Sequence, residues 1–319
     1  MPYLFRKKGI GIKKEATQGN AETLAATDFI HAYDVKITPM VELTPQNYVS
    51  TSLSSFHSLP GKKWYEIEAT IPLKGSGVAG TELAPLGAIM EASGTLLTNT
   101  PATSNVYNRV SSPASGNYYG PGKSFTAKFY EDGILHVAAG CMVESLELSI
   151  KAGMPVGVKF KAKGKYAAVT DAAFPTITPN TTTDPPIVQS ASFTIHSYIA
   201  IIEELSIKIA NKLAMRDDVS SANSIMGFMI ADTPEITGSI NPESTLVATH
   251  DWWAKLMAGT LGGLSIQIGG TAGNIWTITG PKVQYTGVTP GERNGIFTQD
   301  VALKFCRNAG DDEIVFSNT

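Results

Sequence analysis

The chain carries one amphipathic pattern twice, in the stretches Met142–Lys151 and Ile201–Ile209. In each stretch apolar and polar side chains alternate, so successive residues point to opposite sides of an extended backbone. A period of two residues is typical of a strand that buries one face and exposes the other to water. Ser-Phe-Thr precedes both stretches, at Ser124–Thr126 and Ser192–Thr194. The pattern predicts two similar amphipathic strands, one in each half of the chain.

Composition favours an ordered, strand-rich protein. Hydrophobic residues make up 43% and charged residues 17% of the 319 residues, with 30 glycines and 18 prolines. This balance is typical of a turn-rich folded chain rather than a disordered one. The low charge suggests that part of the surface is covered in an oligomer.

The charge distribution argues against a general nucleic-acid binder. The formal net charge is −3, whereas such binders use clustered Lys and Arg. The one basic cluster, Arg6–Lys8 with Lys13 and Lys14, is interpreted as a solvated arm rather than a phosphate clamp.

The two cysteines, Cys141 and Cys306, lie in apolar, strand-like runs and are predicted to be buried free thiols. This favours synthesis in a reducing compartment. Residues 1–8 contain no apolar run long enough for a signal peptide, and no segment approaches the length of a membrane span, so no membrane contact is expected.

Alternation and turn residues predict a succession of strands with two short helices. Helices are expected at Leu83–Ala92 and Glu243–Met257. Long connections are expected at residues 44–63 and 95–123, and a polar turn between Pro234 and Pro242. Strands are expected at 34–41, 64–73, 123–130, 133–138, 141–151 and 156–163 in the first half, and at 192–199, 201–209, 224–231, 263–268, 274–279, 283–286 and 296–305 in the second.

The order of these elements predicts an internal duplication, because each half reads as strands, a short helix ending in small residues, and more strands. A Pro- and Thr-rich segment between the halves reads as a linker. The expected organisation is an N-terminal arm (1–34), a first domain (35–168), a linker (169–190) and a second domain (191–319). The expected fold class is mainly β (α+β), with two tandem β-sandwich or barrel domains and one short flanking helix in each.

Gly75–Gly80 matches the G-x-G-x-x-G pattern between a predicted strand and a predicted helix. One interpretation is a nucleotide-binding enzyme. Three features oppose it: the preceding strand alternates, whereas a central parallel strand is apolar throughout; no second βαβ unit follows; and no acidic residue closes a next strand about 20 residues further on. The alternative is a flexible glycine turn.

Catalytic, cofactor and metal sites are not predicted. The five histidines (His31, His57, His136, His196 and His250) are scattered and have no metal-ligand spacing. Trp252 and Trp253 suit either a ligand-stacking platform or simple packing, with one ring in the sheet and the other at a rim. Packing is the favoured interpretation.

Several segments together resemble the tail tube proteins of bacteriophages, the major tail proteins of long-tailed phages. The resemblance runs from about residue 5 to 316. In the first half it rests on Glu131–Gly140, Glu144–Gly153, Val156–Gly164, and Gly75–Gly80 before Leu83–Gly94. In the second half it rests on Asn241–Ser244, Asp251–Trp253, Gly259–Thr260, Ile275–Pro281, Arg293–Gly295 and Asp311–Ile314.

The resemblance implies a structural virion protein whose strands join those of neighbouring subunits into a β-barrel around a channel. Rings stack into a tube that conducts DNA from capsid to host, with the tape measure protein as a transient occupant and tail terminator and tail tip proteins as partners. The inner tube of a contractile injection device is the alternative. The chain would be made in the host cytoplasm and reside in the virion tail.

The duplication adds an expectation about symmetry. Two copies per chain predict a trimeric ring with pseudo-six-fold symmetry, with a hexamer as the alternative. Residues 44–63, 95–123 and the arm at 1–14 are the expected contacts between rings. The expected channel-lining residues are the polar sides of the two amphipathic strands: Glu147, Ser149, Lys151, Glu204, Ser206 and Lys208.

Overall fold

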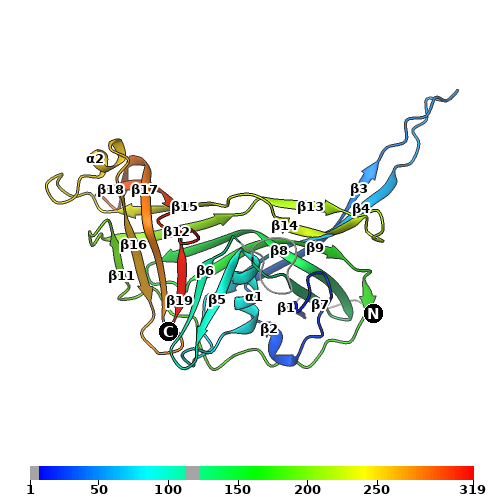
Figure 1. Cartoon of the computed structure of the whole chain (residues 1–319), viewed down its shortest axis with the longest axis horizontal. Coiled ribbons are helices and arrows are strands. Elements are labelled where there is room, and N and C mark those ends of the chain that lie inside the picture. Colours follow the sequence, from blue (N-terminus) through cyan, green and yellow to red (C-terminus); the bar gives the residue numbers. More distant parts are fainter. Residues whose placement is uncertain (1–6, 112–121) are drawn as a thin grey trace.

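The computed structural model describes residues 7–111 and 122–319, and it is mainly β (Figure 1). Every strand pairing among these residues is antiparallel. Two α-helices accompany the strands, α1 (Ala84–Ala92) and α2 (Trp252–Met257), with a 3-10 turn at Ala26–Asp28. The predicted fold class is confirmed.

One long run of strands crosses the whole molecule. Each strand pairs with the next in the order β3 (Asp34–Thr44), β4 (Leu59–Pro72), β9 (Gly157–Tyr166), β8 (Ile134–Lys151), β12 (Ile202–Ala210), β15 (Glu235–Pro242), β18 (Ile296–Cys306) and β17 (Trp276–Arg293). The first four come from the first half of the chain and the last four from the second. We call this run the main sheet.

The N-terminal parts of β8 and β17 leave the main sheet and pair in further layers. On β8 follow β7 (Phe125–Glu131), β1 (Lys8–Lys14), β2 (Phe29–Ile30) and the short β10 (Thr170–Asp171). On β17 follow β16 (Leu261–Ile268), β11 (Ser192–Ile195), β19 (Val315–Asn318), β6 (Ser104–Arg109) and β5 (Thr95–Thr100). Strands of the first half thus complete a layer of the second.

The larger of two hydrophobic clusters in the described residues spans both halves. It includes Ile12 and Leu148 from the first half and Ile207 and Trp276 from the second, all at most 2% exposed. Asn211 of the second half donates hydrogen bonds to the carbonyl oxygens of Ser93 and Val143 at 3.0 and 2.9 Å. The two halves share this cluster, so it does not mark a boundary between separate domains. The linker predicted at 169–190 therefore stays a prediction.

The two halves share two irregularities of strand pairing. On β8, the register shifts where Cys141 and Ala138 face β7, and again between Val143 and Ser145 facing β9. On β17, the same two shifts recur where Val283 and Gly280 face β16, and between Tyr285 and Gly287 facing β18. All four positions are related by one constant shift in numbering. β17 is therefore the counterpart of β8.

The other strands of the main sheet correspond in the same way. Directly opposed residues form a row across β8, β9, β4 and β3, and the matching row crosses β17, β18, β15 and β12. The first row is Ser145, Lys161, Glu68 and Lys36, and the second is Gly287, Ala302, Ser239 and Ser206. β12 is therefore the counterpart of β3.

The prediction that Met142–Lys151 and Ile201–Ile209 are copies of one another is wrong. These stretches form the C-terminal part of β8 and strand β12, which lie side by side with Leu148 opposite Ile207. They look alike because both are central strands with one buried and one polar face. They form the junction between the halves.

Four element predictions fail for physical reasons. Residues 95–123 are not one long loop, because 95–100 and 104–109 pair as β5 and β6; residues 112–121 lie outside the described part of the chain. The stretch before Pro242 is strand β15, whose Ile236 and Ile240 are buried. The helix expected at Glu243–Met257 starts only at Trp252, because the Asp251 side chain caps it by accepting from the Ala254 N–H. Residues 8–14 of the predicted arm form the core strand β1.

Candidate channel face and sheet edges

The six residues expected to line a channel lie together on one face of the main sheet. They form three directly opposed pairs across the junction of β8 and β12: Glu147 with Lys208, Ser149 with Ser206, and Lys151 with Glu204. Their neighbours on the other face, such as Leu148 and Ile207, are fully buried. Strict alternation on both strands produces this separation. We call the side that carries these six residues the polar face.

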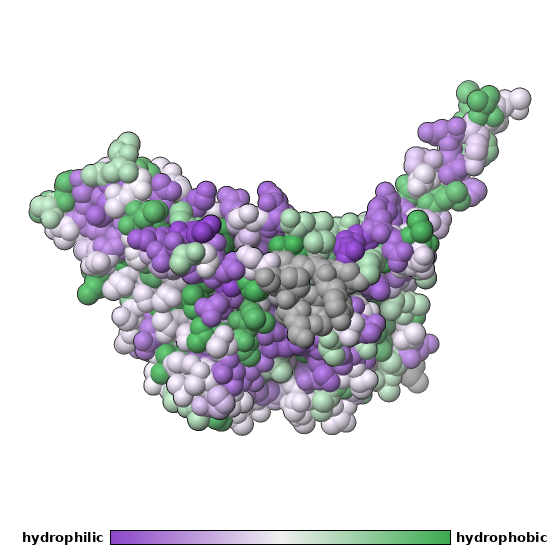
Figure 2. All heavy atoms as spheres, in the orientation of Figure 1, coloured by the Kyte–Doolittle hydropathy of each residue, from purple (hydrophilic) through white to green (hydrophobic). Residues whose placement is uncertain are grey.

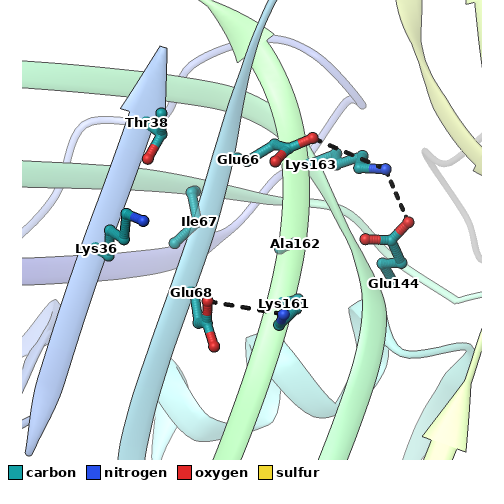
Figure 3. Close-up of a pocket in the computed structure, with 9 residues that line it drawn as sticks. All are labelled: Lys36, Thr38, Glu66, Ile67, Glu68, Glu144, Lys161, Ala162 and Lys163. Carbon is teal, nitrogen blue, oxygen red and sulfur yellow. Dashed lines mark hydrogen bonds and ion pairs between the residues drawn. The ribbon is translucent and has the colours of Figure 1, made fainter. Parts of the chain in front are cut away.

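In the first half, the polar face is a grid of paired charges (Figure 3). Lys163 of β9 lies between Glu144 of β8, at 2.8 Å, and Glu66 of β4, at 4.0 Å. Glu68 of β4 contacts Lys159 at 2.8 Å and Lys161 at 3.8 Å. Neighbouring strands therefore carry opposite charges, which is favourable for cross-strand pairs.

The contact between Glu68 and Lys159 favours the ionised form of both side chains. The hydrogen bond from Lys159 lowers the pKa of Glu68 below its usual value, and the same contact raises the pKa of Lys159. Both side chains are solvated, so each ion pair contributes little to stability. Their main effect is to cancel the local field, which leaves the face polar without a strong attraction for phosphate.

The corresponding surface of the second half has fewer acidic residues on these strands, although Lys208 and Lys304 lie on either side of Thr237 there. Thr237, Ser239 and Ser206 take the places that Glu66, Glu68 and Lys36 hold in the first half. The grid has no local signal in the sequence, because its charges come from strands that are distant in the chain.

The main sheet ends in two open edges. Within the described residues, β3 pairs only with β4, and residues 285–293 of β17 pair only with β18. Ile37 on β3 and Val288 on β17 are only half-buried, although both belong to the apolar side. Open edges with apolar side chains are surfaces that proteins ordinarily cover.

The hairpin of β3 and β4 extends beyond the body of the molecule (Figure 1). Its outer part, residues 45–58, carries exposed Tyr48, Val49, Leu53 and Phe56, and the rings of Tyr48 and Phe56 meet edge to face at 5.3 Å. Figure 2 shows hydrophobic residues at this outer end and hydrophilic ones along the hollowed side from which the hairpin rises.

The second half has a different segment at the place of this hairpin. β13 (Leu213–Asp217) and β14 (Ile225–Ile230) connect β12 to β15 and fold back over the first half. Ile225, Phe228 and Ile230 form a small cluster there with Met142 and Trp64. One connection is therefore covered within the chain, whereas the other projects away from it.

Gly75–Gly80 has the geometry of a packed turn. The Gly75 N–H donates to Asn274 Oδ1 at 2.8 Å, and a Cβ added to Gly75 would lie 1.8 Å from the carbonyl oxygen of Gly273. β4, which precedes the turn, is antiparallel to both of its neighbours, unlike the parallel strand of a dinucleotide fold. Glycine is needed here for close approach of two backbones.

The aromatic residues around α2 pack against one another. Trp252 is fully buried, whereas Trp253 is 37% exposed, in accord with the packing interpretation. His250 Nε2 lies 3.2 Å from the Tyr285 hydroxyl, and burial lowers the pKa of His250 to about 4. His196 stacks on Tyr285 with ring centroids 4.4 Å apart, and burial lowers its pKa too. Both rings are thus neutral at neutral pH.

Other expectations can be placed on the structure. Cys141 is buried and free as predicted, whereas Cys306 is free but only half-buried. Across residues 7–111 and 122–319, no group of three or more His, Cys, Asp or Glu side chains is arranged to hold a metal ion. No helix in the same described residues is long and apolar enough to span a membrane.

In residues 7–111 and 122–319 the chain is thus an antiparallel β protein with one polar face and two open sheet edges. A scan of protein families identifies the family: the phage tail tube protein family matches residues 6–304, and the chain belongs to this family. The family is structural rather than enzymatic, and it associates the chain with the tail of the virion. A search of curated proteins returned no match.

Proposed function

We propose that this protein builds the tail tube of a bacteriophage from stacked rings, each made of three chains. The observation that carries the proposal is the main sheet, in which four strands of one half join four strands of the other and leave one edge open at each end. A chain with two corresponding halves supplies two of six similar sectors. Three chains joined edge to edge then close a pseudo-six-fold barrel, and closure leaves no edge exposed.

In this ring the polar face lines the channel. Glu147, Ser149, Lys151, Glu204, Ser206 and Lys208 lie at the middle of each chain's part of the wall, flanked by the charge grid of the first half. A wall with paired charges and hydroxyl groups stays hydrated and offers no cluster of cations to condense on the DNA backbone. DNA and the tape measure protein therefore pass along it without being held.

The projecting hairpin supplies the contact between rings. Its apolar outer part has no partner surface within the described part of the chain, so in the tube it packs against a chain of the adjacent ring. At the ends of the tube, the same surface faces the tail terminator or the tail tip proteins. This assignment rests on exposure of Tyr48, Val49, Leu53 and Phe56.

Electron microscopy of the purified, concentrated protein tests the proposal. Tubes with a central channel are expected, and averaged end views are expected to show six-fold modulation that reduces to three-fold at higher resolution. A ring of six chains would overturn the trimer while leaving the tube intact. A protein that stays monomeric at high concentration, with or without other tail proteins, would overturn the tube function.

A further inference from the structure

We infer that the junction between two chains copies the junction within one chain, residue for residue. Strand β3 of one chain pairs antiparallel with β17 of the next, with Thr38 directly opposite Thr289. This inference rests on the proposed function and adds to it a defined register for the contact between copies.

The register follows from the correspondence of the two halves. Lys36 on β3 corresponds to Ser206 on β12, so Thr38, two residues further along, corresponds to Lys208. Ser145 on β8 corresponds to Gly287 on β17, so Glu147 corresponds to Thr289. Within the chain, Lys208 lies directly opposite Glu147. Transferring this pair to the open edges places Thr38 opposite Thr289.

Burial supports the same pairing. Ile207 and Leu146, next to Lys208 and Glu147 on the apolar side, are both 0% exposed because β8 and β12 cover one another. Their counterparts at the open edges, Ile37 and Val288, are only half-buried. In the inferred register, a neighbouring chain covers Ile37 and Val288 as β8 and β12 cover their counterparts.

The two open edges differ from the internal junction in their prolines. Pro39 lies on β3 and Pro290 on β17, whereas the corresponding residues of the internal junction are Ile209 and Leu148. Proline lacks an N–H and cannot donate to a sheet ladder, so the contact between chains offers fewer backbone donors than the internal junction. Register at this contact therefore depends more on side-chain packing, which a shift of one residue would place on the wrong face.

Disulfide trapping tests the register. In a Cys306→Ser background, Thr38→Cys and Thr289→Cys are combined and the assembled protein is oxidised. Directly opposed residues in an antiparallel sheet have Cα atoms about 4.5–5.5 Å apart, within reach of a disulfide, whereas diagonal pairs are roughly 7–8 Å apart. Non-reducing electrophoresis is expected to show linked chains in more than half of the protein.

Two matched variants complete the design. Glu147→Cys with Lys208→Cys tests the internal junction and is expected to give a disulfide within one chain, with no increase in mass. Lys36→Cys with Thr289→Cys shifts the trap by two residues on the same face and is expected to link at least tenfold less.

The outcomes separate the two proposals. Efficient linking of the Thr38 and Thr289 variant, with little linking of the shifted one, supports the register. Tubes in which the shifted pair links better, or neither pair links, overturn the register and leave the tube function standing. A Cys306→Ser parent chain that forms no rings or tubes, under conditions where the unmodified protein is also monomeric, overturns the proposed function itself.

Discussion

Truncating two corresponding isoleucines, Ile207→Ala and Ile37→Ala, separates the stability of the chain from the stability of the ring. Ile207 is 0% exposed between β8 and β15, and truncation of a fully buried isoleucine costs about 2–5 kcal/mol. Ile37 is half-buried in the single chain, so we expect about half that cost, roughly 1–2 kcal/mol, in the free energy of unfolding.

The half of Ile37 that stays exposed in the single chain is expected to become buried when chains assemble. If a second chain buries the other half of this side chain, Ile37→Ala weakens each contact between chains by about 1–2 kcal/mol, which is roughly 5- to 30-fold in the association constant. Urea unfolding at low protein concentration measures the first quantity, and sedimentation of tubes against protein concentration measures the second. Equal losses of monomer stability in the two variants, together with unchanged assembly of Ile37→Ala, would refute the reasoning.

Three further predictions concern the single chain. Asn211→Ala leaves the buried carbonyl oxygens of Ser93 and Val143 without this donor and is expected to lower the free energy of unfolding in urea by about 1–3 kcal/mol. Lys212→Ala, at an exposed ion pair, is the control and is expected to lower it by less than about 0.5 kcal/mol. Similar losses in both variants would contradict a role of Asn211 in joining the halves. Gly75→Ala is expected to lower the melting temperature, because the added Cβ meets the Gly273 backbone. Gly270→Ala is the control and is expected to leave the melting temperature unchanged, because no atom lies within 4 Å of a Cβ added there. ATP is expected to shift the melting temperature of neither variant. Burial lowers the pKa of His250 from 6.5 to about 4, so the unfolded chain takes up a proton at a higher pH than the folded chain does. The contribution of neutral His250 to the free energy of unfolding is therefore complete above about pH 6.5 and is lost as the pH falls toward 4. A His250→Gln variant with the same pH profile of stability as the parent would count against this prediction.

Local patterns predicted most strands of the main sheet because alternation is a property of each strand by itself. The predicted bounds of β3 and β12 agree with the structure within a few residues, whereas β8 is one strand where two are predicted, at 133–138 and 141–151. The polar side chains Glu147 and Lys208 lie on one face, as alternation predicts. The packed role of Trp252 also follows from local arguments, whereas the glycine turn, expected to be flexible, is packed against Gly273 and Asn274. A dinucleotide-binding role for Gly75–Gly80 is not supported, because the preceding strand β4 is antiparallel to both of its neighbours.

Local patterns do not predict which strands pair with one another. Alternation in Met142–Lys151 and Ile201–Ile209 indicates which face of each strand is buried but not which strand lies beside it. Two adjacent strands therefore have the same pattern as two repeated ones. β15 was overlooked because Pro234 and Pro242 dominated the reading of a stretch whose isoleucines are buried by β12 and β18. The charge grid depends on the same long-range pairing, since Lys163 meets Glu66 only after β4 and β9 have come together.

The covalent connection between the halves has a consequence for how a tube grows. In the proposed ring of three chains, every second joint between sectors forms when the chain folds, so only three joints between chains remain to be made. The two kinds of sector differ in sequence: one carries paired Lys and Glu side chains, and the other carries Ser and Thr beside Lys208 and Lys304. The bore of such a ring would repeat its charge pattern three times, whereas six identical sectors would repeat it six times.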